Sequence, residues 1–299
     1  MQGICKNSIR SKARPEFVRA KSKFRPEIVS LRTRLRKLHL QTVCESAHCP
    51  NLGECFARRV ATFMILGNIC TRNCSFCAVK KGKPEPLDPK EPEHIAQIAK
   101  ELGLKHIVIT SVTRDDLFDQ GAEQFYKTVL AVKTALPGST VEVLTPDFQG
   151  RMESVERVLE SKPEVFNHNV ETVPRLYLEV RPGADYKRSL SIISFVKRNA
   201  PEIITKSGLM LGMSEKKQEL VKVMRDLVEA GCEVLTLGQY LAPSKKHWQV
   251  VRYYLPEEFE ELKEIGLKMG FKQVFSAPLV RSSFQAEELY LKFRQGEKK

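Results

Sequence analysis

The chain has 299 residues, of which 42% are hydrophobic and 28% are charged, and its formal net charge is +13. This is an ordinary globular composition, and no apolar run reaches the roughly 20 residues that span a bilayer, so we expect no membrane partner. The N-terminus has no apolar signal-peptide core, which predicts a cytoplasmic protein, although its Arg/Lys-rich start also resembles an organelle transit peptide. Clustered cysteines in a reducing compartment indicate metal or catalytic chemistry in preference to disulfides.

The first 40 residues are strongly basic, because they hold twelve lysines and arginines against two glutamates. Such a segment can bind nucleic acid, an anionic membrane or an acidic protein. It can equally pack on its own domain, since Leu31, Leu35 and Leu38 have nearly helical spacing. The sequence leaves both interpretations open.

Six of the eight cysteines fall within 34 residues, in two sets of three. The sets are Cys44, Cys49 and Cys55 in CESAHCPNLGECF, and Cys70, Cys74 and Cys77 in CTRNCSFC. A four-iron cluster normally takes four thiolates, so three would leave one iron open to a substrate, as an open position does at catalytic zinc. Zinc is the alternative ligand for the second set, and His39 or His48 could then supply the fourth bond.

From residue 61 onward, short apolar runs alternate with segments of helical spacing. Strands are expected at 61–67, 106–112, 140–148, 165–172, 203–212 and 233–241. Helices are expected at 91–103, 121–138, 151–161, 186–201, 214–231 and 256–270. This alternation predicts right-handed parallel βαβ units.

Both an open doubly wound sheet and a partial barrel fit this pattern. No GxGxxG motif follows the first strand, which weakens the dinucleotide-binding version of the open sheet. Polar and cysteine-rich segments do follow the strands, where barrel enzymes place their chemistry. We therefore predict an α/β fold, a partial (β/α)6 TIM-like barrel at residues 61–242. A basic N-terminal extension (1–60) and a C-terminal extension (243–299) would flank it.

The second cysteine set resembles the CxxxCxxC signature of radical S-adenosylmethionine (SAM) enzymes. In that superfamily the open iron of a 4Fe-4S cluster binds SAM, and an electron from the cluster splits the sulfonium to give a 5′-deoxyadenosyl radical. From about residue 30 to 290 the chain further resembles the lipoyl synthases. The matching blocks, in family order, are CESAHCPNLGECF, ATFMILGNICTRNCSFCAV, TSVTRDDL, FNHNVETV, VRPGADY, KSGLMLG, LGQYLAPS and RSSF.

The resemblance implies a sulfurtransferase that inserts two sulfur atoms into an octanoyl chain on a lysine of a lipoyl carrier protein. It implies two 4Fe-4S clusters, two SAM molecules per product and an electron donor. The catalytic cluster would be held by Cys70, Cys74 and Cys77. The auxiliary cluster, consumed as sulfur donor, would be held by Cys44, Cys49, Cys55 and Ser282. An oxygen ligand suits iron–sulfur chemistry less well than thiolate, so we expect Ser282 to leave first and count it as catalytic.

Residues for SAM binding are expected around the fourth and fifth strands. Asn167, Asn169 and Glu171 alternate along one predicted strand, so they would share its inner face, whereas His168 would face away as a structural residue. The segment SGLMLG (207–212) could place backbone against the nucleoside. Arg181 could bind an anion or shape a turn, and Lys206 and Gln239 are candidates by position alone; Cys5 and Cys232 are isolated and expected to be inert.

Three residues depart from the family pattern: Gln120 and Ser214 stand where glycine is usual, and Phe284 stands where tyrosine is usual. None removes a cluster ligand. Because lipoyl carriers tend to be acidic, the basic N-terminal segment would bind the carrier, and nucleic acid is not expected as a partner. Two rival functions are a radical enzyme that thiolates transfer RNA and a zinc-stabilised nucleic-acid-binding protein.

Overall fold

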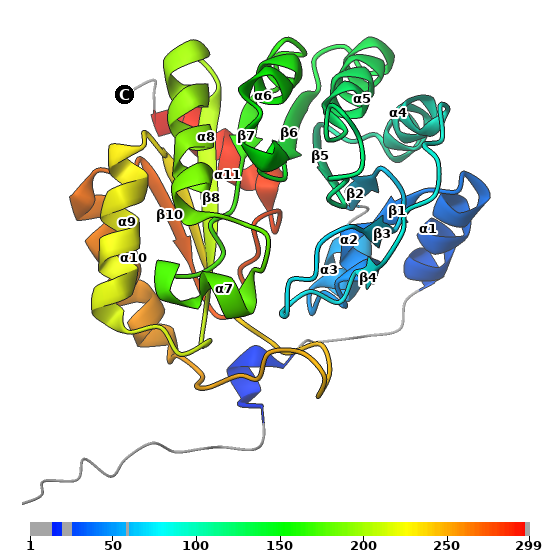
Figure 1. Cartoon of the computed structure of the whole chain (residues 1–299). Coiled ribbons are helices and arrows are strands. Elements are labelled where there is room, and N and C mark those ends of the chain that lie inside the picture. Colours follow the sequence, from blue (N-terminus) through cyan, green and yellow to red (C-terminus); the bar gives the residue numbers. More distant parts are fainter. Residues whose placement is uncertain (1–13, 20–25, 58–59, 297–299) are drawn as a thin grey trace, which may run out of the picture.

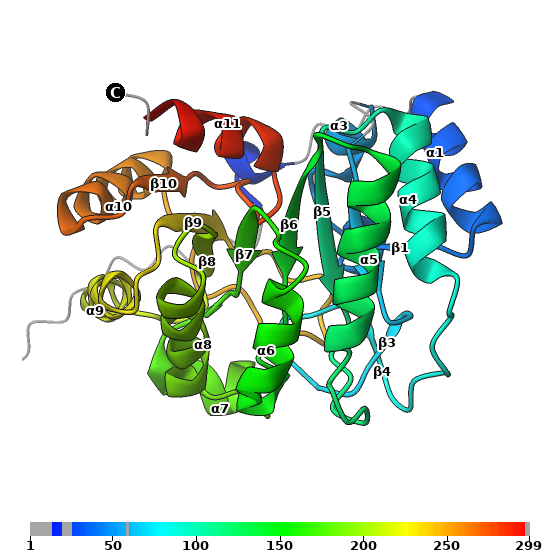
Figure 2. The ribbon, with the colours of Figure 1, turned by 90° about the horizontal axis from the view of Figure 1, so that it is seen from above.

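The computed structural model describes residues 14–19, 26–57 and 60–296. Their strands form one eight-stranded sheet in the order β1-β2-β5-β6-β7-β8-β9-β10, and a separate pair, β3-β4. The seven strands from β2 to β10 are parallel, and β1 pairs antiparallel with β2 at the edge. The sheet curves without closing, with helices along its outer side (Figures 1 and 2). The predicted partial barrel is confirmed.

The strand predictions hold in order, but the observed strands are shorter than expected, most clearly β2, β6 and β7. The strands are β1 (Gln41–Thr42), β2 (Thr62–Ile65), β3 (Ile69–Cys70), β4 (Lys80–Lys81), β5 (His106–Ser111), β6 (Thr140–Leu144), β7 (Val165–Asn167), β8 (Ile204–Leu211), β9 (Val234–Gln239) and β10 (Gln273–Ser276). The sequence did not predict β10, which adds a seventh parallel strand from within the expected C-terminal extension.

All six predicted helices are confirmed within a few residues. The helices are η1 (Glu16–Val18), α1 (Pro26–Lys37), α2 (Val43–Ser46), α3 (Leu52–Ala57), α4 (Glu91–Leu102), α5 (Ala122–Ala135), η2 (Phe148–Gly150), α6 (Met152–Leu159), η3 (Pro174–Leu176), α7 (Tyr177–Val180), α8 (Tyr186–Asn199), α9 (Lys217–Glu229), α10 (Pro256–Met269) and α11 (Ala286–Gly296). Of these described helices, none is both long and apolar enough to span a lipid bilayer.

The basic N-terminal segment packs on the barrel where the structure describes it. Leu31 and Leu35 of α1 are buried in the main hydrophobic core, so the inward-packing interpretation is confirmed for this helix. Burying two leucine side chains stabilises the docked helix by roughly 3–6 kcal/mol. The predictions for Cys5 and for the basic residues within 1–13 and 20–25 lie outside the described residues.

The C-terminal segment passes directly against the sheet after β10. A Cβ atom on Gly238 would lie 2.0 Å from the carbonyl oxygen of Val280, and one on Gly208 would lie 2.9 Å from Ser282 Oγ. Any larger residue at either glycine would push the segment away. The two glycines of β8 and β9 therefore allow Ser282 to lie against the strands.

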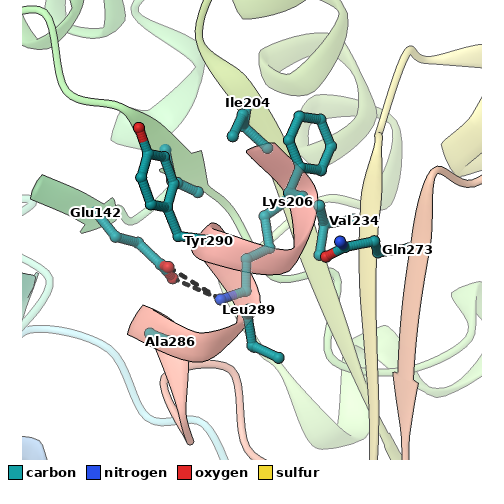
Figure 3. Close-up of a pocket in the computed structure, with 10 residues that line it drawn as sticks. Glu142, Ile204, Lys206, Val234, Gln273, Ala286, Leu289 and Tyr290 are labelled. Carbon is teal, nitrogen blue, oxygen red and sulfur yellow. Dashed lines mark hydrogen bonds and ion pairs between the residues drawn. The ribbon is translucent and has the colours of Figure 1, made fainter. Parts of the chain in front are cut away.

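A buried ion pair lies where α11 covers the amino-terminal ends of the strands. Glu142 of β6 accepts two hydrogen bonds from Lys206 Nζ of β8, at 2.9 and 3.0 Å, beside Leu289 and Tyr290 of α11 (Figure 3). Although burial alone would raise it, the charge of Lys206 lowers the pKa of Glu142 to about 2. The pair keeps two otherwise costly buried charges satisfied.

Candidate active site: a cavity lined by both cysteine sets

A cavity of about 510 Å³ lies at the carboxyl ends of the parallel strands. Its wall includes Thr110, Leu144, Gly208 and Thr236, which come from β5, β6, β8 and β9. Barrel enzymes bind substrates at this end of their strands, and the volume suits a ligand of nucleoside size. Both cysteine sets contribute to the lining, through Cys44, Cys49, Cys70, Cys74 and Cys77.

The second cysteine set begins with Cys70, the last residue of β3, and continues into the loop between β3 and β4. The backbone N–H of Cys77 donates to the carbonyl of Cys74 at 3.2 Å, and that of Gly82 donates to the carbonyl of Cys70 at 3.1 Å, which folds the loop back on itself. Burial raises the pKa of Cys77 to about 12, and burial also raises the pKa of Cys74 against the opposing charge of Arg181. These thiols would therefore bind a metal with loss of their protons.

The first cysteine set lies on two short helices next to the barrel. Cys44 is in α2, Cys49 follows it in a turn, and Cys55 is in α3, outside the cavity lining. Burial raises the pKa of Cys44 to about 11. The side chain of Asn51, between Cys49 and Cys55, donates a 2.7 Å hydrogen bond to the carbonyl of Leu279. This bond joins the first set to the C-terminal segment.

Ser282 reaches the cavity from the opposite end of the chain. It lines the cavity together with Cys44 and Cys49, and its Oγ accepts a 2.7 Å hydrogen bond from Asn169 Nδ2. The expectation that Ser282 ligates a cluster stays a prediction, and the fold meets its geometric condition of a shared cavity.

The predicted SAM-binding residues divide into two groups. Asn169, Glu171 and Arg181 line the cavity. Asn167 and Lys206 do not belong to its lining, because both are bonded to Glu142, Asn167 Nδ2 at 2.9 Å.

The shared inner face expected for residues 167, 169 and 171 was wrong. Strand β7 ends at Asn167, and Glu171 has a left-handed φ of 65°. Glu171 rejoins the sheet only through an isolated bridge to Leu209. Burial raises the pKa of Glu171, so its carboxyl group is easier to protonate than an exposed one.

His168 and Gln239 contact backbone carbonyl groups and do not line the cavity. His168 is fully buried, its Nδ1 lies 3.0 Å from the carbonyl oxygen of Thr145, and burial followed by the charge of Arg181 lowers its pKa to about 4. A neutral, buried histidine agrees with the structural role expected for it. Gln239 Nε2 donates to the carbonyls of Leu211 and Arg252, at 2.8 and 3.0 Å, and is likewise a structural residue.

Two observations indicate that the cavity lining fits an iron–sulfur cluster and SAM. The lining supplies thiols and, from Ser282 among others, hydroxyl groups, which are donor types that can bind such clusters. Asn169 Oδ1 is buried and has no hydrogen-bond partner among the described residues, so a ligand donor can satisfy it. Within residues 14–19, 26–57 and 60–296, no three His, Cys, Asp or Glu side chains are arranged to hold a single metal ion. A four-iron cluster does not need that arrangement, because its thiolates bind different irons.

Sequence reasoning missed the residues that fasten the second set. Arg72 lies inside CTRNCSFC and pairs with Asp115 and Asp147, at 2.8 and 2.6 Å. Asp115 belongs to the TSVTRDDL block, which the sequence identified only as part of the family resemblance. The signal available in the sequence was an arginine within a cysteine motif, together with aspartates that follow the next two barrel strands, Asp115 and Asp147.

Comparison with known proteins places this site in context. Residues 64–227 match the radical SAM superfamily. The chain is 59% identical over 253 residues to a lipoyl synthase of Caldanaerobacter subterraneus subsp. tengcongensis, covering 85% of this chain and 89% of the relative. It is 50% identical over 283 residues to a lipoyl synthase of Rubrobacter xylanophilus, covering 95% and 88%. Among solved structures, methylornithine synthase (PylB) superposes with a TM-score of 0.54 at 15% identity, covering 88% of this chain and 86% of the other, which shows a common fold.

Proposed function

Because the chain belongs to the lipoyl synthases, within the radical SAM superfamily, we propose that it inserts two sulfur atoms into an octanoyl chain carried on a lysine of a lipoyl carrier protein. Membership in the superfamily implies a 4Fe-4S cluster and SAM. The observation that carries the proposal is the single cavity lined by thiols of both cysteine sets and by Ser282. One cavity allows radical formation and sulfur donation to act on the same carbon chain.

The two sets have separate tasks in this proposal. Cys70, Cys74 and Cys77 hold the catalytic cluster and leave one iron open to SAM. The auxiliary cluster is held by Cys44, Cys49, Cys55 and Ser282. When bound, the clusters and SAM supply the electron, the carbon-centred radical chemistry and the sulfur, which no amino-acid side chain provides. The protein residues bind these groups and position the octanoyl carbons between them.

Three cavity residues are suited to hold SAM. The guanidinium of Arg181 can pair with its carboxylate, and the unpartnered Oδ1 of Asn169 can accept a hydrogen bond from its amine or ribose. Glu171, with its raised pKa, can accept from the amine or donate when protonated. We propose no SAM contact for Asn167 and Lys206, because Glu142 already binds both.

Ser282 has a second connection that bears on its release. Asn169 Nδ2 donates to Ser282 Oγ, so one amide side chain can contact both SAM and the ligand of the auxiliary cluster. We propose that Ser282 would be the weakest ligand of the auxiliary cluster, and that the Asn169 amide would hydrogen-bond the serine oxygen when the cluster does not hold it. This would couple dismantling of the donor cluster to occupancy of the SAM site.

The mouth of the cavity suits an acidic carrier. Arg14 lines the cavity, and its Nη2 donates to the carbonyl of Ala242 at 3.1 Å, so the basic N-terminal segment reaches the mouth. Attraction between this segment and an acidic carrier should weaken as salt is raised. Carrier binding that does not change with salt would contradict this part of the proposal. A separate electron donor must also reach the catalytic cluster.

The deciding experiment follows product formation directly. Anaerobically reconstituted protein is incubated with an octanoyl-lysine peptide, SAM and a reductant, and the peptide is analysed by mass spectrometry. We expect a peptide that has gained two sulfur atoms, together with 5′-deoxyadenosine. Cleavage of SAM without sulfur in the peptide, from protein that holds both clusters, would contradict the proposed substrate.

A further inference from the structure

Arg72 lies in the middle of the second cysteine set, yet its guanidinium is engaged with two carboxylates and does not line the cavity. Nε and Nη2 donate to the two oxygens of Asp115, at 2.8 and 2.9 Å, and Nη2 also lies 2.6 Å from Asp147 Oδ1. Asp147 is fully buried and also pairs with Arg188 at 3.1 Å. A two-pronged arginine–carboxylate contact, here partly buried, fixes the geometry of both partners.

The sulfur of Cys70 accepts two backbone hydrogen bonds near this arginine. The donors are the N–H of Arg72 itself, at 3.5 Å, and the N–H of Thr113, at 3.4 Å. Thr113 and Asp115 belong to the loop that follows β5, so the Arg72–Asp115 contact joins the two segments that supply the donors. Thr71 also connects these two segments, since its N–H donates to the carbonyl of Thr113 at 3.0 Å.

We propose that Arg72 is a positioning residue that holds these two N–H groups on Cys70 and so sets the reduction potential of the catalytic cluster. The inference rests on the proposed function, because Cys70 is there a ligand of that cluster. Hydrogen bonds to cluster sulfurs are one of the main determinants of potential. Two N–H dipoles that point at a thiolate stabilise the reduced, more negative state, so they raise the potential.

The test is a redox titration of the full chain carrying its clusters. The catalytic cluster is identified as the one whose electron paramagnetic resonance signal changes when SAM is added. We expect Arg72→Gln and Asp115→Asn to shift its midpoint potential to more negative values. Arg72→Lys should give a smaller shift, because an ammonium group keeps the charge and loses the planar two-pronged contact.

A matched control is Arg175→Gln. Arg175 makes the same two-pronged contact with Glu219, at 2.8 and 3.0 Å, but on the surface and away from the cysteines. Its removal should leave the potential unchanged. A shift as large as that of Arg72→Gln would overturn the proposal, because it would show that any lost ion pair moves the potential.

If Arg72→Gln does not retain the cluster, two other measurements test the role of Arg72. Asp115→Asn leaves the Arg72–Asp147 pair in place, so its potential can still be measured. Hydrogen exchange in cluster-free protein is a second readout, and we expect faster exchange of the Arg72 and Thr113 amides in Asp115→Asn. An unchanged potential, or unchanged exchange at both amides, would overturn the proposal. Failure of wild-type protein to form a SAM-responsive cluster would instead count against the proposed function.

Discussion

The two cysteine loops of this protein are fastened to the barrel by different kinds of contact. The loop of Cys70, Cys74 and Cys77 is tied down by Arg72, whose charge is shared between two carboxylates, one of them fully buried. The loop of Cys44, Cys49 and Cys55 is joined to the C-terminal segment by the neutral hydrogen bond from Asn51 to Leu279. Among the described residues, an ion pair of this loop, Arg32 with Glu45, is partly exposed.

This difference agrees with the proposed chemistry, in which the catalytic cluster is retained and the auxiliary cluster is consumed. A buried charged contact is costly to break, because it leaves an unpaired charge away from water, so it favours a cluster that persists. A neutral hydrogen bond contributes only about 1 kcal/mol and exchanges partners readily, which suits a cluster that is taken apart. The proposed fourth ligand, Ser282, comes from a separate segment of the chain, so its release would not require either loop to unfold.

The largest effect should come from removing one thiol in each loop. We expect Cys74→Ala to abolish both SAM cleavage and sulfur insertion, because the catalytic cluster is lost. Cys49→Ala should abolish sulfur insertion while SAM cleavage continues. The buried, isolated Cys232 is the control, and Cys232→Ala should keep both. Quantifying 5′-deoxyadenosine and thiolated peptide separates the cases, and loss of both products in Cys49→Ala would contradict the division of tasks.

The next effect concerns the ligand expected to leave first. Ser282→Cys should retain iron but slow sulfur insertion by about tenfold or more, which corresponds to about 1.4 kcal/mol on the barrier. The reason is that thiolate holds iron more firmly than an alkoxide-type oxygen in this chemistry. Ser283 also lines the cavity, so Ser283→Cys is the neighbouring control and should have a smaller effect. Unchanged turnover in Ser282→Cys would refute the release step.

The charged fastening of the second loop predicts a dependence of stability on pH. Although burial alone would raise it, the hydrogen bond from Arg72 lowers the pKa of Asp147 from 3.8 to about 2. A lowered folded-state pKa stabilises the protein above about pH 4, and the stabilisation is lost as the pH falls from about 4 to about 2. It amounts to about 2 kcal/mol of unfolding free energy.

Asp147→Asn should therefore lower stability at pH 7 by about 2–4 kcal/mol and flatten the loss between pH 4 and 2. Denaturant titrations at pH 7 and pH 3 measure both quantities. The control is Glu219→Gln on the surface pair with Arg175, where solvent screens the interaction and the loss should be smaller. Equal losses of unfolding free energy in the two variants would show that the buried pair contributes no more to stability than the exposed pair.

The barrel and the cysteine sets could be predicted because they depend on local pattern. Buried strands alternate with amphipathic helices, and the spacing of the cysteines is visible in the chain. Partners distant in sequence could not be predicted. Lys206 was placed in the site by position alone, whereas it meets Glu142, which is 64 residues away. The bond from Asn51 to Leu279 spans 228 residues and has no local signal.

Local backbone geometry explains the other failures. The alternation of polar residues after Phe166 imitates a strand, but the left-handed φ of Glu171 takes the chain out of the ladder. Strand β10 reads Gln-Val-Phe-Ser, which is neither a polar–apolar alternation nor a continuous apolar run, so its residues carry no strand signal. Arg72 was overlooked because a single arginine does not reveal which carboxylates it will meet.

A moderate effect should follow from weakening the neutral connection of the first loop. Asn51 is buried, so Asn51→Ala removes a hydrogen bond and leaves the carbonyl of Leu279 unsatisfied, at a cost of about 1–3 kcal/mol. We also expect iron to be lost from the auxiliary cluster before the catalytic one, as measured by iron content and the SAM-responsive signal. Asn199 makes a similar side-chain bond to the carbonyl of Phe195 on the surface, and Asn199→Ala should change neither quantity.

The smallest effect lies outside both loops and gives a baseline for the others. Ser214 has a left-handed φ of 98°, which glycine adopts without steric cost and other residues do not. Ser214→Gly should therefore stabilise the protein by about 0.5–1 kcal/mol, whereas Ser214→Ala should not, because alanine keeps the Cβ atom. Thermal unfolding measures both variants. Since Ser214 does not line the cavity that the thiols share, iron content should stay constant. A change in cluster retention in these variants would mean that retention depends on global stability rather than on the contacts of each loop.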